Sequence, residues 1–196
     1  IAMLQVGDPP GATPLAPEDL AGLMQTWIST REELNVAEQA NIVAGIVWAK
    51  RSRRGKLLSD GYLRSLHKAM FGEVWSWAGR LRTRETNIGV PPHSIPIAIR
   101  ELLDTAQYWV DRRPFPPDAI AVHLHHRLVQ IHPFPNGNGR HTRLVADLLV
   151  EQLGRPVFSW GRTSLVDAGP LRASYIAALK EADRQNIEPL LAFARS

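Results

Sequence analysis

The segment His132–Arg143, HPFPNGNGRHTR, lies between two apolar and periodic stretches, Ile120–Ile131 and Leu144–Leu153. The spacing of apolar residues on both sides predicts a helix, a loop and a second helix, with polar chemistry in the loop and at the mouth of the second helix. Gly137 and Gly139 allow the sharp backbone turn that this arrangement needs. The architecture of the chain is therefore expected to be built around this loop.

The loop contains the residue types that bind phosphate. The first backbone N–H groups of a helix have no partner inside the helix, and the helix dipole favours negative charge at that end. We therefore expect the backbone of Gly137, Asn138 and Gly139 to cradle a phosphate group. Arg140 and Arg143 are three residues apart and share one helix face, where two guanidinium groups suit a polyphosphate.

Two more side chains of the loop suit chemistry on such a ligand. Asn136 offers a carbonyl oxygen to a Mg²⁺ ion that bridges phosphates. His132 belongs to a residue type with an ordinary pKa of about 6.5, so it can act as a neutral base near physiological pH. The residues alone predict a phosphate-bearing ligand, a metal ion and proton transfer by one histidine.

The same segment resembles the signature of the Fic family, His-Pro-Phe-x-(Asp/Glu/Asn)-Gly-Asn-Gly-Arg-x-x-Arg, at every fixed position. The stretches Trp77-Ala78-Gly79, Arg82-Thr83 and Asn87-Ile88-Gly89 are similar to the part of the family that leads into its flap. The resemblance extends along the whole chain to one subgroup of Fic proteins, up to the final Ser196.

The resemblance implies an all-α fold: a single Fic-type helical domain with a central buried helix after the loop and a short β-hairpin flap. In the family this flap aligns a segment of the target protein by strand addition. Its expected residues here are Thr86, Asn87, Ile88, Gly89 and Val90. We expect residues 1–16 to be an extended lead-in and residues 17–196 to form the single domain.

The activity implied by the resemblance is transfer of AMP from ATP to a Ser, Thr or Tyr hydroxyl of an unidentified target protein. The cofactor would be Mg²⁺, with Mn²⁺ as an alternative. The implied roles are proton acceptance by His132, phosphate binding by Gly137, Asn138, Gly139, Arg140 and Arg143, metal binding by Asn136, and anchoring of the loop in the core by Phe134. Asn136 replaces the Asp or Glu of many members, and an amide is a weaker Mg²⁺ ligand than a carboxylate.

Residues 26–35 have two interpretations. Ser29 and Thr30 followed by acidic residues predict a capped helix start. The resemblance instead implies an inhibitory segment, because Ser29-x-x-x-Glu33 has the spacing of a family motif whose glutamate pairs with the second signature arginine, here Arg143. Leu34 stands where that motif has Gly or Asn. Both interpretations remain open at this stage.

Three alternatives to AMP transfer are compatible with the sequence. The first two are transfer of another nucleotide or phosphate group and removal of AMP. The third is a non-catalytic module that binds a nucleotide or a partner. The intact Gly139, Arg140 and Arg143 favour a bound triphosphate, and His132 argues against a non-catalytic module. The resemblance also implies a small helix-turn-helix protein as a regulatory companion.

Composition excludes several other classes. The chain has 196 residues, no cysteine and a formal charge of +4, so it has neither disulfides nor thiolate metal sites. No apolar run approaches the ~20 residues that span a membrane, and a cytoplasmic location is expected. The basic run Lys50–Lys56 is interpreted as a solvated helix end in preference to a nucleic-acid contact. His123, His125 and His126 are better explained as hydrogen-bonded helix residues than as zinc ligands, because their spacing completes no ligand set.

Capping signals and apolar periodicity predict the remaining helices. They are expected at Pro17–Trp27, Asn35–Arg54, Ser59–Phe71, Ile95–Arg112, from Asp118 to the loop, Pro170–Arg184 and Glu188–Ala194. In the second of these, Ile42, Val43, Ile46, Val47 and Ala49 are expected to form one broad apolar face.

Overall fold

The computed structural model describes residues 13–52, 57–161 and 169–196, and these residues fold into helices joined by loops. The helices are α1 (Pro17–Leu20), α2 (Arg31–Arg51), α3 (Asp60–Phe71), α4 (Ile95–Arg112), α5 (Pro117–Ile131), α6 (Asn138–Gln152), α7 (Pro170–Asp183) and α8 (Glu188–Arg195), with a 3₁₀ turn at Pro92–Ser94. Within the described ranges the only β-type pairing is an isolated antiparallel bridge between Leu23 and Trp75. The predicted all-α class is confirmed.

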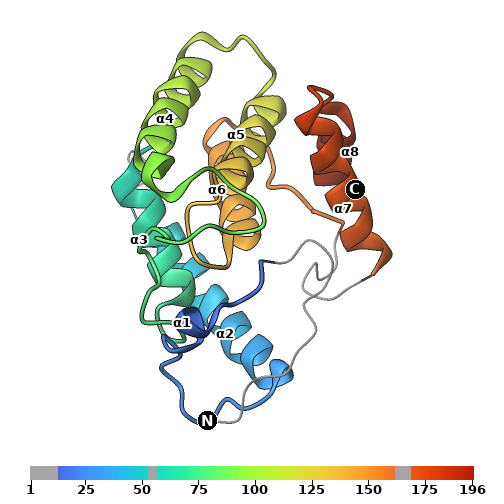
Figure 1. Cartoon of the computed structure of the whole chain (residues 1–196). Coiled ribbons are helices and arrows are strands. Elements are labelled where there is room, and N and C mark those ends of the chain that lie inside the picture. The colour runs from blue at the N-terminus through green and yellow to red at the C-terminus, as the bar shows by residue number, and fades with distance from the viewer. Residues whose placement is uncertain (1–12, 53–56, 162–168) are drawn as a thin grey trace.

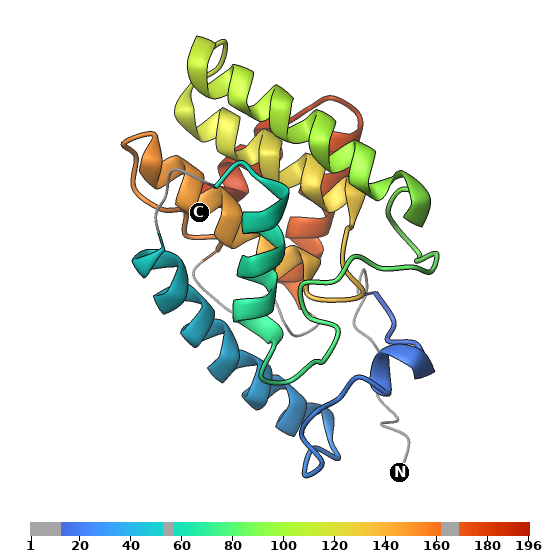
Figure 2. The ribbon, with the colours of Figure 1, turned by 90° about the vertical axis from the view of Figure 1, so that its left-hand side faces the viewer.

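Helices α5 and α6 form the centre of the molecule, and the other helices surround them (Figure 1). Helix α4 lies along α5, α2 pairs with α3, and α7 pairs with α8 (Figure 2). Val145, Ala146, Leu149 and Val150 of α6 are almost completely buried. The prediction of a central buried helix after the loop is therefore confirmed.

Two helix starts have the side-chain caps that the sequence predicts. The hydroxyl of Ser59 accepts a hydrogen bond from the Tyr62 N–H at 3.2 Å, and α3 follows. The hydroxyl of Thr30 accepts one from the Glu33 N–H, also at 3.2 Å. Such bonds satisfy N–H groups that have no partner inside the helix. Because Thr30 is the cap, α2 begins four residues before the expected start at Asn35.

The first helix is shorter than the sequence predicts, because α1 ends at Leu20 and the expected end was Trp27. After α1 the backbone bonds to a distant segment: the Met24 N–H donates to the Val74 carbonyl, and the Ser76 N–H donates to the Gly22 carbonyl, both at 2.9 Å. Gly22 also lies against the Trp77 indole, where an added Cβ atom would come within 2.4 Å of the ring. These tertiary bonds override the local helical pattern.

The predicted β-hairpin flap is wrong in its secondary structure: residues 83–91 form no strand. The two ends of this segment bond to the loop after α5 and not to each other. The Arg82 N–H donates to the Pro133 carbonyl at 2.9 Å, and the Val90 N–H donates to the Ile131 carbonyl at 3.3 Å. The backbone groups that would close a hairpin are therefore used to hold the segment against the loop. Pro91, which has no N–H, follows directly.

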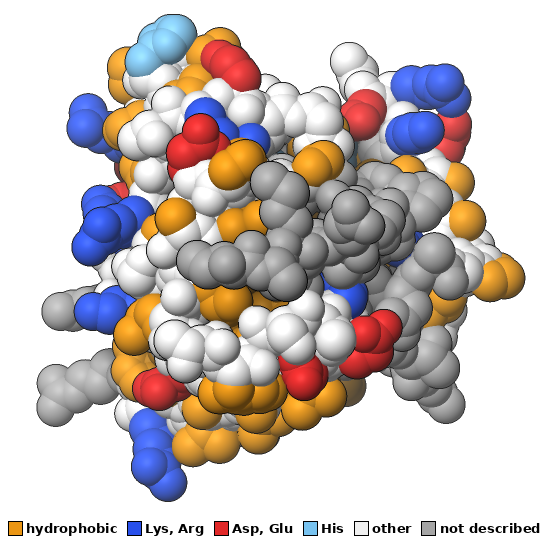
Figure 3. Space-filling model, turned by 60° about the horizontal axis from the view of Figure 1, so that its bottom comes forward, with side chains coloured by type: hydrophobic (Ala, Val, Ile, Leu, Met, Phe, Trp, Pro, Cys, Tyr) orange, Lys and Arg blue, Asp and Glu red, His pale blue; other side chains and the backbone are white. Residues whose placement is uncertain are grey.

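The apolar face of α2 is narrower than predicted. Ile42 and Ala49 are buried, whereas Val43 and Val47 are 52% and 42% exposed. Helix α2 packs mainly against α3, so one side of it remains at the surface. Figure 3, which brings the bottom of Figure 1 forward, shows hydrophobic side chains gathered among charged ones on this side of the molecule.

Two predictions fall partly or wholly outside the described residues: most of the lead-in at 1–16, and the end of the basic run, Arg53–Lys56. None of the helices in the described ranges combines the length and the apolar composition that a bilayer crossing requires.

Candidate active site

The predicted catalytic histidine lies at the turn between α5 and the loop. His132 follows the last residue of α5 and has a left-handed backbone, with φ of 53°. This conformation is uncommon for a residue with a Cβ atom and is maintained only where surrounding contacts require it. The ring is 5% exposed. The turn therefore fixes the direction in which His132 presents its ring.

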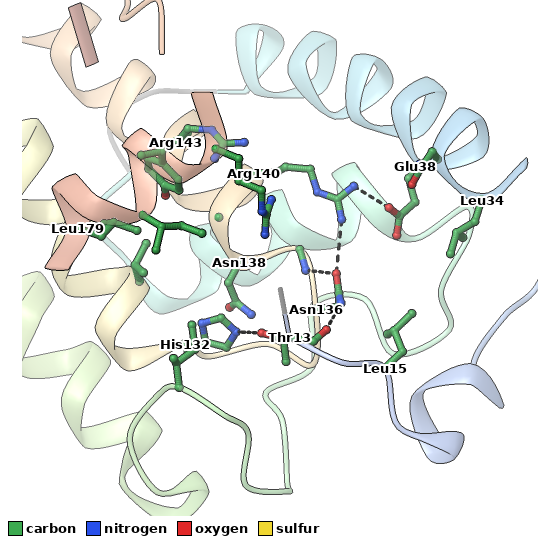
Figure 4. A pocket seen from close by; sticks show the side chains of 18 of the residues that line it. Thr13, Leu15, Leu34, Glu38, His132, Asn136, Asn138, Arg140, Arg143 and Leu179 are labelled. Atoms are coloured by element: carbon green, nitrogen blue, oxygen red, sulfur yellow. Dashed lines mark hydrogen bonds and ion pairs between the residues drawn. The ribbon is translucent and has the colours of Figure 1, made fainter. Parts of the chain in front are cut away.

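The Nε2 atom of the His132 ring has a hydroxyl group as its partner. Nε2 lies 2.7 Å from Oγ1 of Thr13, which is also buried (Figure 4). Burial, together with the nearby positive charge of Arg82, lowers the pKa of His132 to about 4, although the Val129 carbonyl opposes this shift. The ring is therefore neutral at physiological pH, and in the tautomer protonated on Nδ1 it can accept the Thr13 hydroxyl proton at Nε2.

The residues predicted to cradle phosphate lie at the start of α6. Gly137 is the cap of α6 and has φ of 78°, and an added Cβ atom there would lie 2.7 Å from the Phe71 ring. Helix α6 begins at Asn138, so the first N–H groups of the helix face the same cavity as His132. A side chain at Gly139 would meet only Arg143 and Tyr175, no closer than 3.6 Å. This end of α6 suits an anion.

The side chain of Asn138 holds the loop, and only its backbone is available for phosphate. Its Oδ1 accepts from the Phe134 N–H at 2.9 Å, and its Nδ2 donates to the Phe134 carbonyl at 2.8 Å. Phe134 itself is 1% exposed. The geometry thus places Phe134 in the core, where it was predicted, and adds an amide clamp around its backbone.

A second histidine supports the loop from α3. Nδ1 of His67 accepts from the Gly79 N–H at 3.0 Å, so its proton is on Nε2, which donates to the Asn136 carbonyl at 3.0 Å. The His67 ring stacks on Phe134 with 3.8 Å between ring centres. Burial holds the pKa of His67 well below its ordinary value. A neutral His67 therefore orients both Phe134 and the backbone of Asn136.

Arg82 joins the loop to the segment that was expected to be a flap. Its guanidinium donates to four backbone carbonyls, with Nε 2.6 Å from the His132 carbonyl. The others belong to Arg84, Val90 and Ile131. Arg82 is 3% exposed, and burial lowers its pKa. The Arg82 side chain therefore has a structural role, because it holds the backbone of His132.

Four arginines converge on the cavity beside this loop. Arg140 and Arg143 come from α6, Arg31 from α2 and Arg172 from α7. Burial, followed by the charges of Arg143, Arg140 and Arg31, lowers the pKa of Arg172. Arg143 also lies over the Tyr175 ring at 5.4 Å. The cavity is strongly electropositive and suits a polyphosphate.

Only one carboxylate lines the cavity among the described residues, that of Glu38 in α2. Its Oε2 lies 2.6 Å from Nη1 of Arg140, and its Oε1 accepts from the Trp75 indole at 2.7 Å. Glu38 is 5% exposed. The dashed lines in Figure 4 show that the carboxylate of Glu38 is bonded to Arg140, which was predicted to bind phosphate.

The predicted pairing of Glu33 with Arg143 does not form in this structure. Oε2 of Glu33 accepts from the Ser29 N–H at 2.7 Å, the Ser29 hydroxyl at 3.0 Å and the Thr30 N–H at 3.0 Å. These bonds lower the pKa of Glu33, led by the Ser29 N–H. They complete a capping box with Thr30. The helix-cap interpretation is therefore confirmed.

Asn136 lies at the predicted metal position but already has protein partners. Its Oδ1 accepts from the Gly137 N–H at 2.6 Å and faces Arg140 at 3.4 Å, and its Nδ2 donates to the Thr13 carbonyl at 3.2 Å. No cluster of three His, Cys, Asp or Glu side chains suited to a metal exists within the described ranges. A Mg²⁺ ion fits this donor set only where phosphate and water supply most of its ligands, which is how Mg²⁺ usually binds with nucleotides.

The cavity measures about 150 Å³. This is smaller than the ~300–1,000 Å³ typical of small-molecule sites. Figure 4 shows Thr13 and Glu38 directed into it from two different segments of the chain. A nucleotide would therefore require Glu38 to move away from Arg140.

Two residues of the predicted flap reach the loop after α5. Ile88 lines the cavity and is 41% exposed. Gly89 has φ of 113°, and an added Cβ atom would lie 2.8 Å from the His132 Cβ. The Thr86 hydroxyl donates to the Ile88 carbonyl at 2.6 Å, which closes a local turn. The segment of Thr86, Asn87, Ile88, Gly89 and Val90 thus borders the site as a loop.

The other histidines of α5 do not line the cavity and have partners of their own. Nε2 of His126 lies 2.8 Å from Asp183, and Nε2 of His125 lies 3.1 Å from the Tyr175 hydroxyl. His123 packs against the Trp109 and Phe115 rings.

The cavity thus combines a neutral buried histidine, a helix start suited to an anion and four arginines. Residues 57–150 match the Fic/DOC family model, so the chain contains a Fic/DOC family domain. The chain is 30% identical over 119 residues to protein adenylyltransferase fic-1 of Caenorhabditis elegans, which covers 59% of this chain and 22% of the relative. It is 30% identical over 134 residues to protein adenylyltransferase Fic of Drosophila virilis, covering 65% and 26%. The chain thus spans about a quarter of these relatives' length.

Solved structures share the fold. The BepC effector of Bartonella tribocorum, with bound AMPPNP, superposes with a TM-score of 0.71 at 16% identity, covering 92% of this chain and 97% of that chain. An ADP-bound Fic domain from Bartonella quintana gives 0.67 at 18% identity, covering 87% and 86%. At these identities the likeness shows an all-helical Fic-like fold.

Sequence reasoning missed several residues of the site: Thr13, Glu38, His67, Arg82 as the ligand of four carbonyls, and Arg172. One of them had a readable signal. Glu38 is in helical phase with the apolar Leu34 and Ile42, and a glutamate on the buried face of a helix requires a partner.

Proposed function

We propose that this chain is a protein adenylyltransferase that transfers AMP from ATP to a hydroxyl group of a target protein. The observation that carries the proposal is the contact of 2.7 Å between the neutral Nε2 of His132 and a hydroxyl oxygen, in the cavity that the start of α6 lines. A base in contact with a hydroxyl beside an anion cradle is the arrangement that nucleophilic attack on a phosphate requires.

In this proposal the acceptor hydroxyl gives its proton to His132 as its oxygen attacks the α-phosphorus. The N–H groups at the start of α6 hold the phosphates, and Arg140 and Arg143 neutralise the pyrophosphate that leaves. Catalysis then comes mostly from positioning and from charge stabilisation. Bound Mg²⁺ would neutralise phosphate charge, with Asn136 as its protein ligand.

We also propose that a glutamate of α2 restrains the site, and that this glutamate is Glu38. The 2.6 Å ion pair of Glu38 with Arg140 supports this assignment, whereas the carboxylate of Glu33 is used in the helix cap. A carboxylate and a phosphate compete for the same guanidinium fork. ATP binding would require Arg140 to exchange Glu38 for the nucleotide.

The test incubates the protein and a cell lysate with Mg²⁺ and ATP labelled at either the α- or the γ-phosphate. AMP transfer leaves the α-label on protein and the γ-label in pyrophosphate. His132→Ala should abolish labelling, and His93→Ala, at an exposed turn histidine, is the matched control. Protein labelled by γ-labelled ATP would indicate phosphate transfer. Loss of label from pre-labelled protein would indicate AMP removal, and ATP binding without any transfer would leave a non-catalytic module.

The finer identity is also a proposal. The resemblance along the whole chain is to the Fic proteins called mobile mystery protein B, and it carries the expectation of a helix-turn-helix companion and of a cytoplasmic location. Co-purification of such a companion from the native host would support this assignment.

A further inference from the structure

We propose that Thr13 is an acceptor of the transferred group in cis, so that the chain modifies its own N-terminal segment. This inference rests on the proposed function, because it names a substrate hydroxyl for the same site. The observation behind it is direct: the hydroxyl in contact with His132 belongs to the chain itself, 119 residues away in sequence. Thr13 also lines the cavity together with Gly137, Gly139 and Arg140.

The carbonyl groups of Thr13 and Pro14 both accept hydrogen bonds from distant side chains. Asn136 Nδ2 donates to the Thr13 carbonyl at 3.2 Å, and Arg84 Nη2 donates to the Pro14 carbonyl at 3.1 Å. Arg84 is itself paired with the buried carboxylate of Asp19. Thr13 thus reaches His132 on a segment whose backbone is held by two side chains, those of Asn136 and Arg84.

The local sequence also favours an extended presentation. A residue before proline is restricted to extended conformations. Thr13 precedes Pro14 and Ala16 precedes Pro17, and Ala16 is extended, with φ of −75° and ψ of 161°. The Ala16 N–H then donates to Asp19 at 2.9 Å, where α1 begins. Proline and these contacts therefore restrict the segment before any nucleotide binds, which lowers the entropy cost of presenting Thr13.

The chemistry balances with ATP as the only co-substrate. Oγ1 of Thr13 bonds to the α-phosphorus, the bond from that phosphorus to the bridging oxygen breaks, and pyrophosphate leaves. The hydroxyl proton moves to Nε2 of His132. A buried threonine is otherwise an unusual partner for a catalytic base, since its hydroxyl blocks access by any other acceptor while it remains there.

The experiment uses the full chain with α-labelled ATP and Mg²⁺, followed by trypsin digestion and fragment-ion mass spectrometry. The first basic residue is Arg31, so residues 1–31 form one peptide, which contains Thr13, Thr26, Ser29 and Thr30. The expected result is an AMP group on Thr13. Thr13→Val should lower the label on this peptide at least tenfold, and Thr13→Ser should retain it. Thr105→Val, at an exposed threonine of α4, is the matched control and should label as the wild type does.

Two further measurements test the reaction in cis. The labelled fraction at a given time should not change when the protein is diluted, and active protein should not label Thr13 of an added His132→Ala chain. Dependence on protein concentration, or labelling of that inactive chain, would overturn the inference. Circular dichroism of Thr13→Val shows whether a loss of label reflects misfolding.

The outcomes separate the two proposals. Label on a lysate protein, or at another position of this chain, without label on Thr13 overturns the inference and leaves the proposed function intact. ATP binding with no label on any protein overturns both.

Discussion

Glu38 and Arg140 form an ion pair across the candidate site, with 2.6 Å between Oε2 and Nη1, and they join α2 to the first turn of α6. The two side chains are 102 residues apart in sequence. Each is mostly buried, so water screens the pair weakly. An arginine predicted to bind a nucleotide phosphate is therefore engaged by a carboxylate in this structure.

Replacing Glu38 should strengthen nucleotide binding. Glu38→Gln removes the competing charge and keeps an acceptor for the Trp75 indole. A charge-assisted hydrogen bond contributes about 1.5–3 kcal/mol, so we expect ATP affinity to rise about tenfold or more. Calorimetric titration with a non-hydrolysable ATP analogue measures this change. Glu101→Gln, at an exposed position of α4, is the control, and unchanged or weaker affinity in Glu38→Gln would contradict the restraint.

Disrupting the cap of α2 should change stability without activating the site. Thr30→Ala removes the cap hydroxyl and should lower the free energy of unfolding by about 1 kcal/mol. Glu33→Ala should also lower the melting temperature, because it removes the carboxylate that accepts from Ser29 and Thr30. Urea denaturation and the AMP-transfer assay test both variants. Stronger labelling by Glu33→Ala than by wild type would restore the inhibitory role of Glu33.

Arg82→Lys should loosen the catalytic loop. Lysine offers one ammonium group and cannot reproduce the guanidinium fork that contacts four carbonyls. Leaving buried carbonyls unpaired costs about 1–3 kcal/mol each, so we expect the free energy of unfolding to fall by about 2 kcal/mol or more. AMP transfer should fall as well, because Arg82 holds the His132 carbonyl. Arg100→Lys, on the exposed face of α4, is the comparison, and equal stability of the two variants would refute this role.

Asn136→Asp should reduce the Mg²⁺ concentration needed for half-maximal AMP transfer, because a carboxylate binds Mg²⁺ more strongly than an amide. A Mg²⁺ titration of AMP transfer, at saturating ATP, compares the two proteins. An unchanged titration curve would show that the ion draws no ligand from this position.

Acid should destabilise the protein below about pH 6.5. Burial is the main cause that lowers the pKa values of His125, His132 and His141, to about 3, 4 and 4. Their contribution to stability is complete above the ordinary value of 6.5. It is lost as the pH falls toward 4, because the unfolded chain then binds protons that the folded chain does not. One pKa unit corresponds to about 1.4 kcal/mol. Urea denaturation between pH 7.5 and 4.5 tests this prediction.

Asp147 should partly offset that loss. Burial raises its pKa to about 6, against hydrogen bonds from Trp160 and Phe158 that lower it. As the pH falls from about 6 to the ordinary pKa of 3.8, Asp147 is protonated in the folded state but ionised in the unfolded state. The folded state therefore gains stability over this pH range. Asp147→Asn removes this contribution, so its stability should fall more steeply with acid than that of the wild type. Equal slopes in the two proteins would argue against a raised pKa.

The local features of the fold were readable from the sequence. The Ser59 cap, the bounds of α4 and the buried α6 follow from short-range patterns that tertiary contacts reinforce. The expected β-hairpin failed for a long-range reason: the N–H groups of Arg82 and Val90 bond to the loop after α5. Such pairing has no signature in either segment alone.

The candidate site could be predicted only in part, because several of its residues are brought together by long-range contacts. The loop carries its own chemistry, so His132 and Arg140 could be proposed from their type and spacing. Thr13 acquires its position from contacts with the distant residues Arg84, His132 and Asn136. The choice between Glu33 and Glu38 depended on which face of α2 is buried, which one sequence indicates weakly.

The second contact of Glu38 has a consequence for how easily the site opens. When Arg140 turns toward a phosphate, the Trp75 indole still donates to the Glu38 carboxylate, at 2.7 Å in this structure. The anion is then left with one hydrogen bond instead of none, and a buried charge with no partner is the costliest outcome of breaking an ion pair. In the proposed mechanism, the hydrogen bond from Trp75 therefore lowers the energetic cost of separating Glu38 from Arg140. Replacing this tryptophan by phenylalanine would make the ion pair of Glu38 and Arg140 harder to break, without changing any residue proposed to contact the nucleotide.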